Sequence, residues 1–164
     1  MVAATGCGGN DGGQVTTDAD LLVPSKRDYI IQADTVCAGT EQAIETEAEV
    51  GLGIDANDFR VLPSGEIVFK PGRQPRPQRI ERFGTEVVIP ALRKQLVDLR
   101  ALTPPRGDEQ TVAEIYDRSE TGLERLAADP SLFNDRGAVR RELSQARELG
   151  RRYGFFECGT YSGP

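Results

Sequence analysis

The sequence predicts a mainly all-α fold: an up-down-up-down four-helix bundle with a small β-hairpin or ordered-loop insertion between the first and second helices. Three observations support this class. Four segments repeat apolar residues at three- and four-residue steps, which is the period of an amphipathic helix. The connections after the second and third segments are short and contain proline, which favours antiparallel neighbours. A chain of 164 residues is long enough for one domain with tails.

We expect three regions along the chain. Residues 1–25 would be a lipobox-like start and flexible tether, residues 26–159 the four-helix domain, and residues 160–164 a C-terminal tail. The first helix is expected from about Asp28 to Val50, with Ser25 or Asp28 as its N-cap. Glycines follow this helix and end it, because glycine adopts the left-handed C-cap conformation without strain.

Residues 51–77 are the expected insertion. Two short apolar runs, Phe59–Leu62 and Glu66–Phe69, flank Pro63-Ser64-Gly65, whose proline and glycine suit a tight turn. An ordered loop is the alternative. Long connections in helical domains often carry binding, so this insertion is the candidate interaction surface, while a lid over the bundle end is the other possibility. Its outward cations would be Arg60, Arg73 and Arg76.

The second helix is expected from about Gln78 to Leu102. Pro90 lies inside it, and since proline lacks an N–H and clashes with the preceding turn, we expect a kink or break near Val87–Ile89.

The last two helices follow short breaks in the pattern. The third is expected from Asp108, a plausible N-cap, to Asp129, and the fourth from about Asp135 to Tyr153. Between them, we expect a short turn whose Phe133 plugs one end of the bundle.

The surroundings of Cys7 predict a location. Small residues precede it in Ala4-Thr5-Gly6-Cys7, and a glycine-rich run follows it. This arrangement is typical of a bacterial protein whose cysteine carries a lipid once the signal segment is removed. We therefore expect lipidation of Cys7, a membrane contact through that lipid, and an extracytoplasmic location on the outer face of the cell membrane. Only three residues precede this box, so a start further upstream and a chance match both stay open.

The chain has three cysteines, an odd number that needs an explanation in a secreted protein. If Cys7 carries a lipid, Cys37 and Cys158 are left to form a disulfide in an oxidising compartment. The predicted bundle places the end of the fourth helix beside the start of the first, so a chain reversal at Gly154 would let Cys158 reach Cys37. Two ordinary buried thiols in a cytosolic protein are the alternative.

Three motifs carry a resemblance to known sequences. The chain has D-Y-I-x-x-A-D-x-x-C at Asp28–Cys37, L-x-x-L-R-A-L-x-P-P-x-G-D at Leu96–Asp108, and a partial match to A-x-x-Y-G-x-x-x-C-G at Arg151–Gly159. With its Gly-Cys-Gly-Gly start, it resembles a group of small, largely uncharacterised predicted lipoproteins of actinobacteria. The resemblance covers about residues 26–159 apart from the insertion. It implies a helical, disulfide-clasped extracytoplasmic domain, and it does not indicate any particular activity.

Composition argues against several function classes. The chain has no histidine, the commonest general base and transition-metal ligand. Its net charge of −6 argues against a nucleic-acid partner. The spacing of Cys37 and Cys158 does not fit a metal site, and no glycine loop has the context needed to hold phosphate. We therefore expect no metal, no cofactor and no catalysis.

Charged residues are patterned on two of the predicted helices. Glu41, Glu45 and Glu49 follow at four-residue steps, where like charges repel mildly. We expect these glutamates to be solvated or, for Glu45 and Glu49, to pair with Arg136 and Arg140 of the fourth helix; a cation site is the alternative. The arginines of the fourth helix also permit contact with an anionic envelope surface: Arg136, Arg140, Arg141, Arg147, Arg151 and Arg152.

Together, these observations favour a lipid-anchored binding or interaction module of the bacterial cell envelope. Its partner would be an envelope protein or an anionic polymer. A small-ligand carrier with an apolar bundle cavity is the first alternative. An enzyme that uses carboxylates alone is the second, although no facing pair of carboxylates is evident in the sequence.

Overall fold

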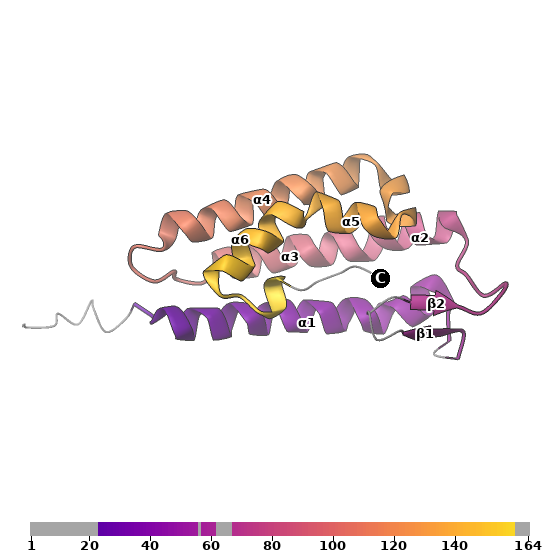
Figure 1. Ribbon diagram of the computed structural model, residues 1–164, viewed down its shortest axis with the longest axis horizontal. Coiled ribbons are helices and arrows are strands. Elements are labelled where there is room, and N and C mark those ends of the chain that lie inside the picture. The colour runs from indigo at the N-terminus through magenta and orange to yellow at the C-terminus, as the bar shows by residue number, and fades with distance from the viewer. Residues whose placement is uncertain (1–22, 56, 62–66, 160–164) are drawn as a thin grey trace, which may run out of the picture.

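The structure is a computed structural model that describes residues 23–55, 57–61 and 67–159. The fold is mainly helical, as predicted, and it includes one small antiparallel sheet (Figure 1). The helices are α1 (Lys26–Leu52), α2 (Pro77–Phe83), α3 (Ile89–Arg100), α4 (Glu109–Ala128), α5 (Arg136–Glu142) and α6 (Ser144–Tyr153). The expected tether, with Cys7, and the C-terminal tail at 160–164 lie outside the described residues.

Helix α1 begins and ends where its capping residues predict. The hydroxyl of Ser25 accepts a hydrogen bond from the backbone N–H of Asp28 at 3.1 Å. At the other end, Gly53 adopts a left-handed φ of 62° and its N–H bonds back to the last turn. The buried side of the helix is formed by Tyr29, Ala33, Cys37, Ile44 and Leu52.

The insertion contains a hairpin rather than an ordered loop. Strand β1 (Phe59–Val61) pairs antiparallel with β2 (Ile67–Phe69), with Phe59 opposite Phe69. The two phenyl rings meet edge to face, 5.9 Å apart, so they pack on each other. The hairpin lies beyond the C-terminal part of α1, at the right of Figure 1. The expected turn at Pro63-Ser64-Gly65 lies outside the described residues.

The second predicted helix is interrupted one turn before Pro90. A π-helical turn over Gly84–Val88 joins α2 to α3, and the N–H of Ile89 reaches the carbonyl of Gly84. The extra residue in this turn accommodates the proline without a sharp break. Gly84 also makes room for the ring of Phe133, because a Cβ at this position would lie 2.3 Å from that ring.

The fourth predicted helix is two helices, and its expected continuity was wrong. The chain breaks at Leu143, between α5 and α6. The hydroxyl of Ser144 donates to the carbonyl of Arg141 at 2.7 Å, and such local bonds compete with helical ones. At the same place α5 approaches α4 closely, since a Cβ on Gly122 would lie 2.6 Å from the carbonyl oxygen of Glu142.

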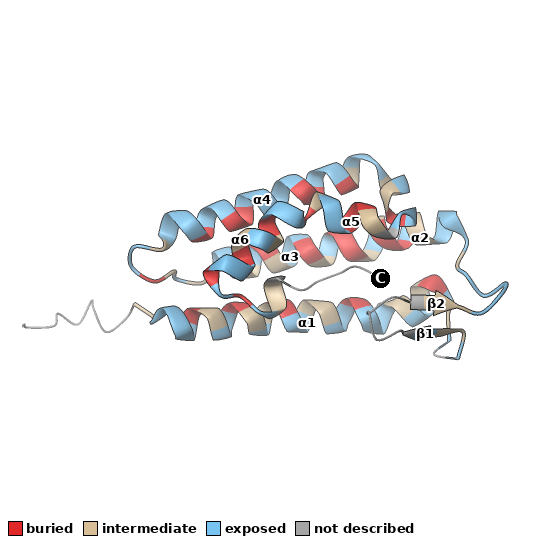
Figure 2. Cartoon of the chain, in the orientation of Figure 1, coloured by how far each residue is buried: buried red, intermediate tan, exposed pale blue. Residues whose placement is uncertain are grey.

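The helices pack in a chain of neighbours around one core. Helix α1 packs on α2 and α3, α3 packs on α4, and α4 packs on α6. The residues after α6 fill the space between α6 and α1, so these two helices meet mainly through that segment (Figure 1). Buried residues line the facing sides of the helices in Figure 2.

Candidate functional site

The segment Gly154–Cys158, which we call the C-terminal clasp, is held to α1 by covalent and hydrogen bonds. Gly154 ends α6 with a φ of 119°, a left-handed conformation that glycine adopts readily, and reverses the chain towards α1. Cys158 then forms a disulfide with Cys37, with the two Cα atoms 5.2 Å apart. The predicted pairing is confirmed, and the alternative of two thiols is not what the structure contains.

A carboxylate on α1 holds the clasp as well. Asp34 accepts hydrogen bonds from the backbone N–H of Phe156 at 3.0 Å and of Cys158 at 3.2 Å. It lies one turn before Cys37, so the hydrogen-bonded and covalent attachments share one side of α1. Sequence reasoning missed this role, although Asp34 belongs to the motif that carries the resemblance. Its position one turn before a cysteine was the available signal.

The first aromatic residue of the clasp enters the core. The Phe155 side chain is 3 % exposed and its ring lies 5.0 Å from that of Tyr153 and 6.2 Å from that of Tyr29. A Cβ at Gly150 would lie 3.4 Å from this ring, in ordinary van der Waals contact, so the ring packs closely against α6. Phe156, by contrast, is 70 % exposed. The clasp therefore places one phenylalanine inside the domain and one in solvent.

Beneath the clasp lies a buried pair of phenols. The hydroxyls of Tyr29 and Tyr116 are 2.6 Å apart, and each side chain is almost fully buried. Burial raises the pKa of both phenols, so both stay protonated at neutral pH. One hydroxyl donates to the other, and this buried hydrogen bond joins α1 to α4.

The ends of α1 and α6 meet beside this pair. The hydroxyl of Tyr153 donates to Asp108 at 2.8 Å, and burial together with this carboxylate raises the pKa of Tyr153. The Lys26 ammonium lies 4.0 Å from the centre of the Tyr153 ring. The expectation that the last helix ends beside the start of the first is met by this contact.

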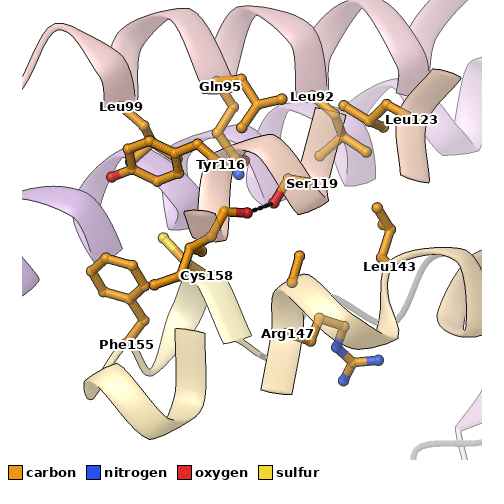
Figure 3. Close-up of a pocket in the computed structure, with 13 residues that line it drawn as sticks. Leu92, Gln95, Leu99, Tyr116, Ser119, Leu123, Leu143, Arg147, Phe155 and Cys158 are labelled. Carbon is orange, nitrogen blue, oxygen red and sulfur yellow. Dashed lines mark hydrogen bonds between the residues drawn. The ribbon is translucent and has the colours of Figure 1, made fainter. Parts of the chain in front are cut away.

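A small cavity lies between α3, α4, α6 and the clasp (Figure 3). Its volume is about 60 Å³, and its lining is largely apolar, with Gln95, Ser119 and Arg147 as polar members. Phe155 and Cys158 contribute to its wall from the clasp. An engineered cavity of about 150 Å³ holds one benzene, so this space is too small for an acyl chain or a drug-sized ligand.

Glu45 and Glu49 are exposed, which fits the solvation that we expected as an alternative to pairing with the fourth helix. Within the described part of the chain, Glu45 and Glu49 form no ion pair with Arg140, because α5 packs on α4 and the Pro130–Asn134 turn instead of on α1. The side chain of Arg136 lies outside what the structure describes. Among the described residues, no group of acidic and cysteine side chains could hold a metal ion.

The pKa values of two charged side chains near the clasp are shifted. Burial raises the pKa of Glu41, and the nearby carboxylates of Glu45 and Glu157 raise it further. Burial lowers the pKa of Arg147, and the guanidiniums of Arg140 and Arg151 lower it further.

The hairpin arginines lie where they were predicted to lie, on the outside. Arg60 is on β1, and Arg73 and Arg76 are on the connection to α2; all three are exposed. Arg73 pairs with Asp58 at 3.4 Å, across the base of the hairpin. This pair holds the two sides of the insertion together, while Arg60 and Arg76 have no ion-pair partner among the described residues.

Comparison with known proteins finds no matching family model, no similar curated protein and no similar solved structure. Of the helices described, none is both long and apolar enough to cross a membrane.

Proposed function

We propose that this protein is a lipid-anchored interaction module of the bacterial cell envelope, outside the cytoplasm. Its finer architecture would be the up-down-up-down four-helix bundle, with α2 and α3 forming the second member and α5 and α6 the fourth. Cys7 would carry the lipid, and the domain would serve as a rigid platform that binds a partner and performs no chemistry.

The observation that carries this proposal is the Cys37–Cys158 disulfide. Disulfides that hold a fold together persist in oxidising compartments and are rare in the cytosol. The pairing also uses two of the three cysteines, so Cys7 is the one left over for a lipid.

The hairpin is the candidate contact for an envelope protein. It lies at the far end of α1 from the point where residues 1–25 enter the domain, and 27 residues of helix span roughly 40 Å. Arg60 and Arg76 are exposed there and available to an acidic partner. The small volume of the cavity favours this interaction role over that of a ligand carrier.

Intact mass spectrometry of the protein from its native membrane tests the anchor. We expect a diacylglycerol-sized increment on Cys7, and thiols at Cys37 and Cys158 that react with an alkylating agent only after reduction. An unmodified Cys7 would refute the anchor, and three thiols that are alkylated without reductant would refute the envelope location.

Crosslinking in cells tests the hairpin. A triple variant with Arg60→Gln, Arg73→Gln and Arg76→Gln should lose its crosslinked partner. A variant with Arg27→Gln, Arg82→Gln and Arg93→Gln, three arginines that are exposed outside the hairpin, removes the same number of charges and should keep it. Equal crosslinking by both variants would exclude the hairpin as the contact.

A further inference from the structure

The hairpin leaves one edge of strand β1 without a neighbouring strand. The sheet pairs β1 with β2, and among the described residues no helix packs extensively on either strand. In Figure 1, β1 lies on the outer side of β2, away from α2 and α5. An edge strand presents backbone N–H and C=O groups that can pair with another chain. The edge of β1 that faces away from β2, which we call the open edge, is therefore able to accept a further strand.

The register of the hairpin shows which backbone groups lie at the open edge. The N–H of Lys70 donates to the carbonyl of Asp58 at 2.8 Å, so these residues form a hydrogen-bonded pair at the end of the ladder. Bonded and non-bonded pairs alternate along an antiparallel ladder, and Phe59 opposite Phe69 is the next pair. The N–H and C=O of Phe59 therefore point away from β2. No hydrogen bond joins them to another described residue.

One face of the hairpin carries positive charge beside this edge. Arg60 is the central residue of β1 and lies on the face opposite to the two packed phenyl rings. Lys70 shares the face of Arg60, because residues 58 and 60 point to one side of the sheet together with their cross-strand partners, 68 and 70. Both cations are exposed, and neither has an ion-pair partner among the described residues. An acidic side chain next to β1 would be attracted to this face.

The acid on the same face, Asp58, is already engaged. Its carboxylate accepts a hydrogen bond from the N–H of Asp55 at 3.0 Å and pairs with Arg73 at 3.4 Å. This matters for a second copy of the chain. Two β1 strands paired about Arg60 would place like charges opposite each other, which is destabilising, and a register shifted by two residues would need Asp58 as the partner of Arg60. The charges therefore favour an acidic segment of another protein over self-pairing.

We propose that the open edge of β1 binds an extended acidic segment of a partner protein as an additional antiparallel strand. This inference rests on the proposed function, in which the hairpin is the contact, and it specifies how that contact forms. The backbone groups of Phe59 and Val61 bond to the segment, and Arg60 selects acidic residues at alternate positions of it. Antiparallel addition continues the pattern of the existing sheet.

Peptide binding by the full chain tests this inference. The protein carries Cys7→Ser, and the probe is a labelled peptide of sequence V-E-V-E-V-E-V, blocked at both ends, whose binding is measured by fluorescence anisotropy. We expect binding that weakens as salt rises, and about ten-fold weaker binding of the counterpart V-K-V-K-V-K-V. Amide hydrogen exchange measured by nuclear magnetic resonance should slow at Phe59 when the glutamate peptide is bound.

Methylation of the peptide backbone tests the edge directly. With a glutamate opposite Arg60, valines lie opposite Phe59 and Val61, and the alternation of pairs directs the valine N–H groups towards β1. N-methylation of the valines should therefore abolish binding. N-methylation of the glutamates, whose N–H groups point away from β1, should change the affinity by less than about two-fold.

Charge reversal in the protein tests the selectivity. Arg60→Glu should weaken binding of the glutamate peptide about ten-fold and strengthen binding of the lysine peptide. Arg82→Glu, at an exposed arginine of α2, changes the net charge equally and should keep the original preference. Slow exchange of the Lys70 amide, which is bonded to Asp58, verifies that the hairpin persists in the Arg60 variant.

The outcomes separate this inference from the proposed function. No binding of the glutamate peptide, or a loss on methylation that is not larger for the valines, overturns strand addition. Dimers of the free chain in which exchange slows at Phe59 also overturn it and assign the open edge to a second copy. Crosslinking in cells that depends on the hairpin, without peptide binding, would leave the proposed function standing and refute this inference alone. Peptide binding supports strand addition even if Cys7 proves to be unmodified, because the assay does not use the lipid.

Discussion

Removal of the disulfide should destabilise the domain strongly. The double variant Cys37→Ala with Cys158→Ala is compared with the disulfide-bonded chain. Both proteins also carry Cys7→Ser. The bond links residues 121 positions apart. Closing so long a loop restricts the unfolded chain far more than the folded one, in which α1 and the clasp are already in contact.

The magnitude follows from the length of the loop. For a separation of 121 residues, the chain-entropy relation gives about 5 kcal/mol at 25 °C. Measured effects are often smaller, about 2–4 kcal/mol, because unfolded chains retain structure. We expect a loss of about 3–5 kcal/mol in the free energy of unfolding, which lowers the melting temperature of a domain of this size by about 10–15 °C.

Urea unfolding followed by far-ultraviolet circular dichroism measures this loss. The midpoint should fall, and the dependence of the free energy on urea should steepen, because an unlinked unfolded chain exposes more surface. Wild-type protein under reductant should match the double variant. Asp34→Asn in the disulfide-bonded chain should lose only about 1–2 kcal/mol, since it weakens one exposed and one partly buried hydrogen bond. A loss below about 1 kcal/mol in the double variant would refute the loop argument.

Three further predictions concern packing and charge. Gly84→Ala should destabilise the domain by about 2–4 kcal/mol, because its Cβ would overlap the ring of Phe133. Gly39→Ala, whose Cβ meets nothing within 4 Å, should stabilise α1 by about 0.5–1 kcal/mol. Thermal unfolding of the two variants measures both effects, and equal effects would contradict the close approach of Gly84 to Phe133. Burial raises the pKa of Tyr29 and Tyr116 above the ordinary value of 10.0, so the unfolded chain releases these protons first, and stability should fall as pH rises beyond about 10. The variant with both tyrosines changed to phenylalanine should lose part of that slope in urea titrations at high pH, and an unchanged slope would count against the buried pair. Glu41→Gln should raise stability slightly at pH 7, because the pKa of Glu41 is raised in the folded protein and its ionisation therefore disfavours folding at a pH above the pKa of the unfolded chain. A urea midpoint that changes equally at pH 7 and at pH 3 would contradict this account.

The local structure of the chain follows largely from the sequence. Capping residues mark where α1 begins and ends, since Ser25 and Gly53 act through their own neighbouring backbone groups. Apolar periodicity identifies the buried sides, and the two β-forming runs predict the hairpin. Each of these signals depends on residues within a few positions of one another, so no knowledge of the tertiary structure is needed.

The break at Leu143 shows the limit of this reasoning. The apolar period of residues 135–153 is compatible with one continuous helix, yet the chain forms α5 and α6. The break between α5 and α6 lies where Gly122 allows α4 to approach the carbonyl of Glu142 closely. The apolar periodicity of either segment gives no sign of a contact between positions so far apart in the sequence.

The candidate site was predictable in part. Cysteine counting gives the Cys37–Cys158 bond, and length and composition indicate an exposed hairpin. The role of Asp34 and the phenol pair of Tyr29 and Tyr116 were not predictable, because each depends on the rotation of one helix against a distant segment.

The sequence by itself determined which segments are helical, apart from the break at Leu143, and which of their sides are buried, and it predicted the pairing of Cys37 with Cys158. Only the tertiary structure decided which acid meets which arginine. Helical periodicity places a charge on the outer side of a helix but does not say which helix lies opposite it. The partner of Glu142 is therefore Arg125 of α4, and Arg140 and Arg151 are left facing solvent.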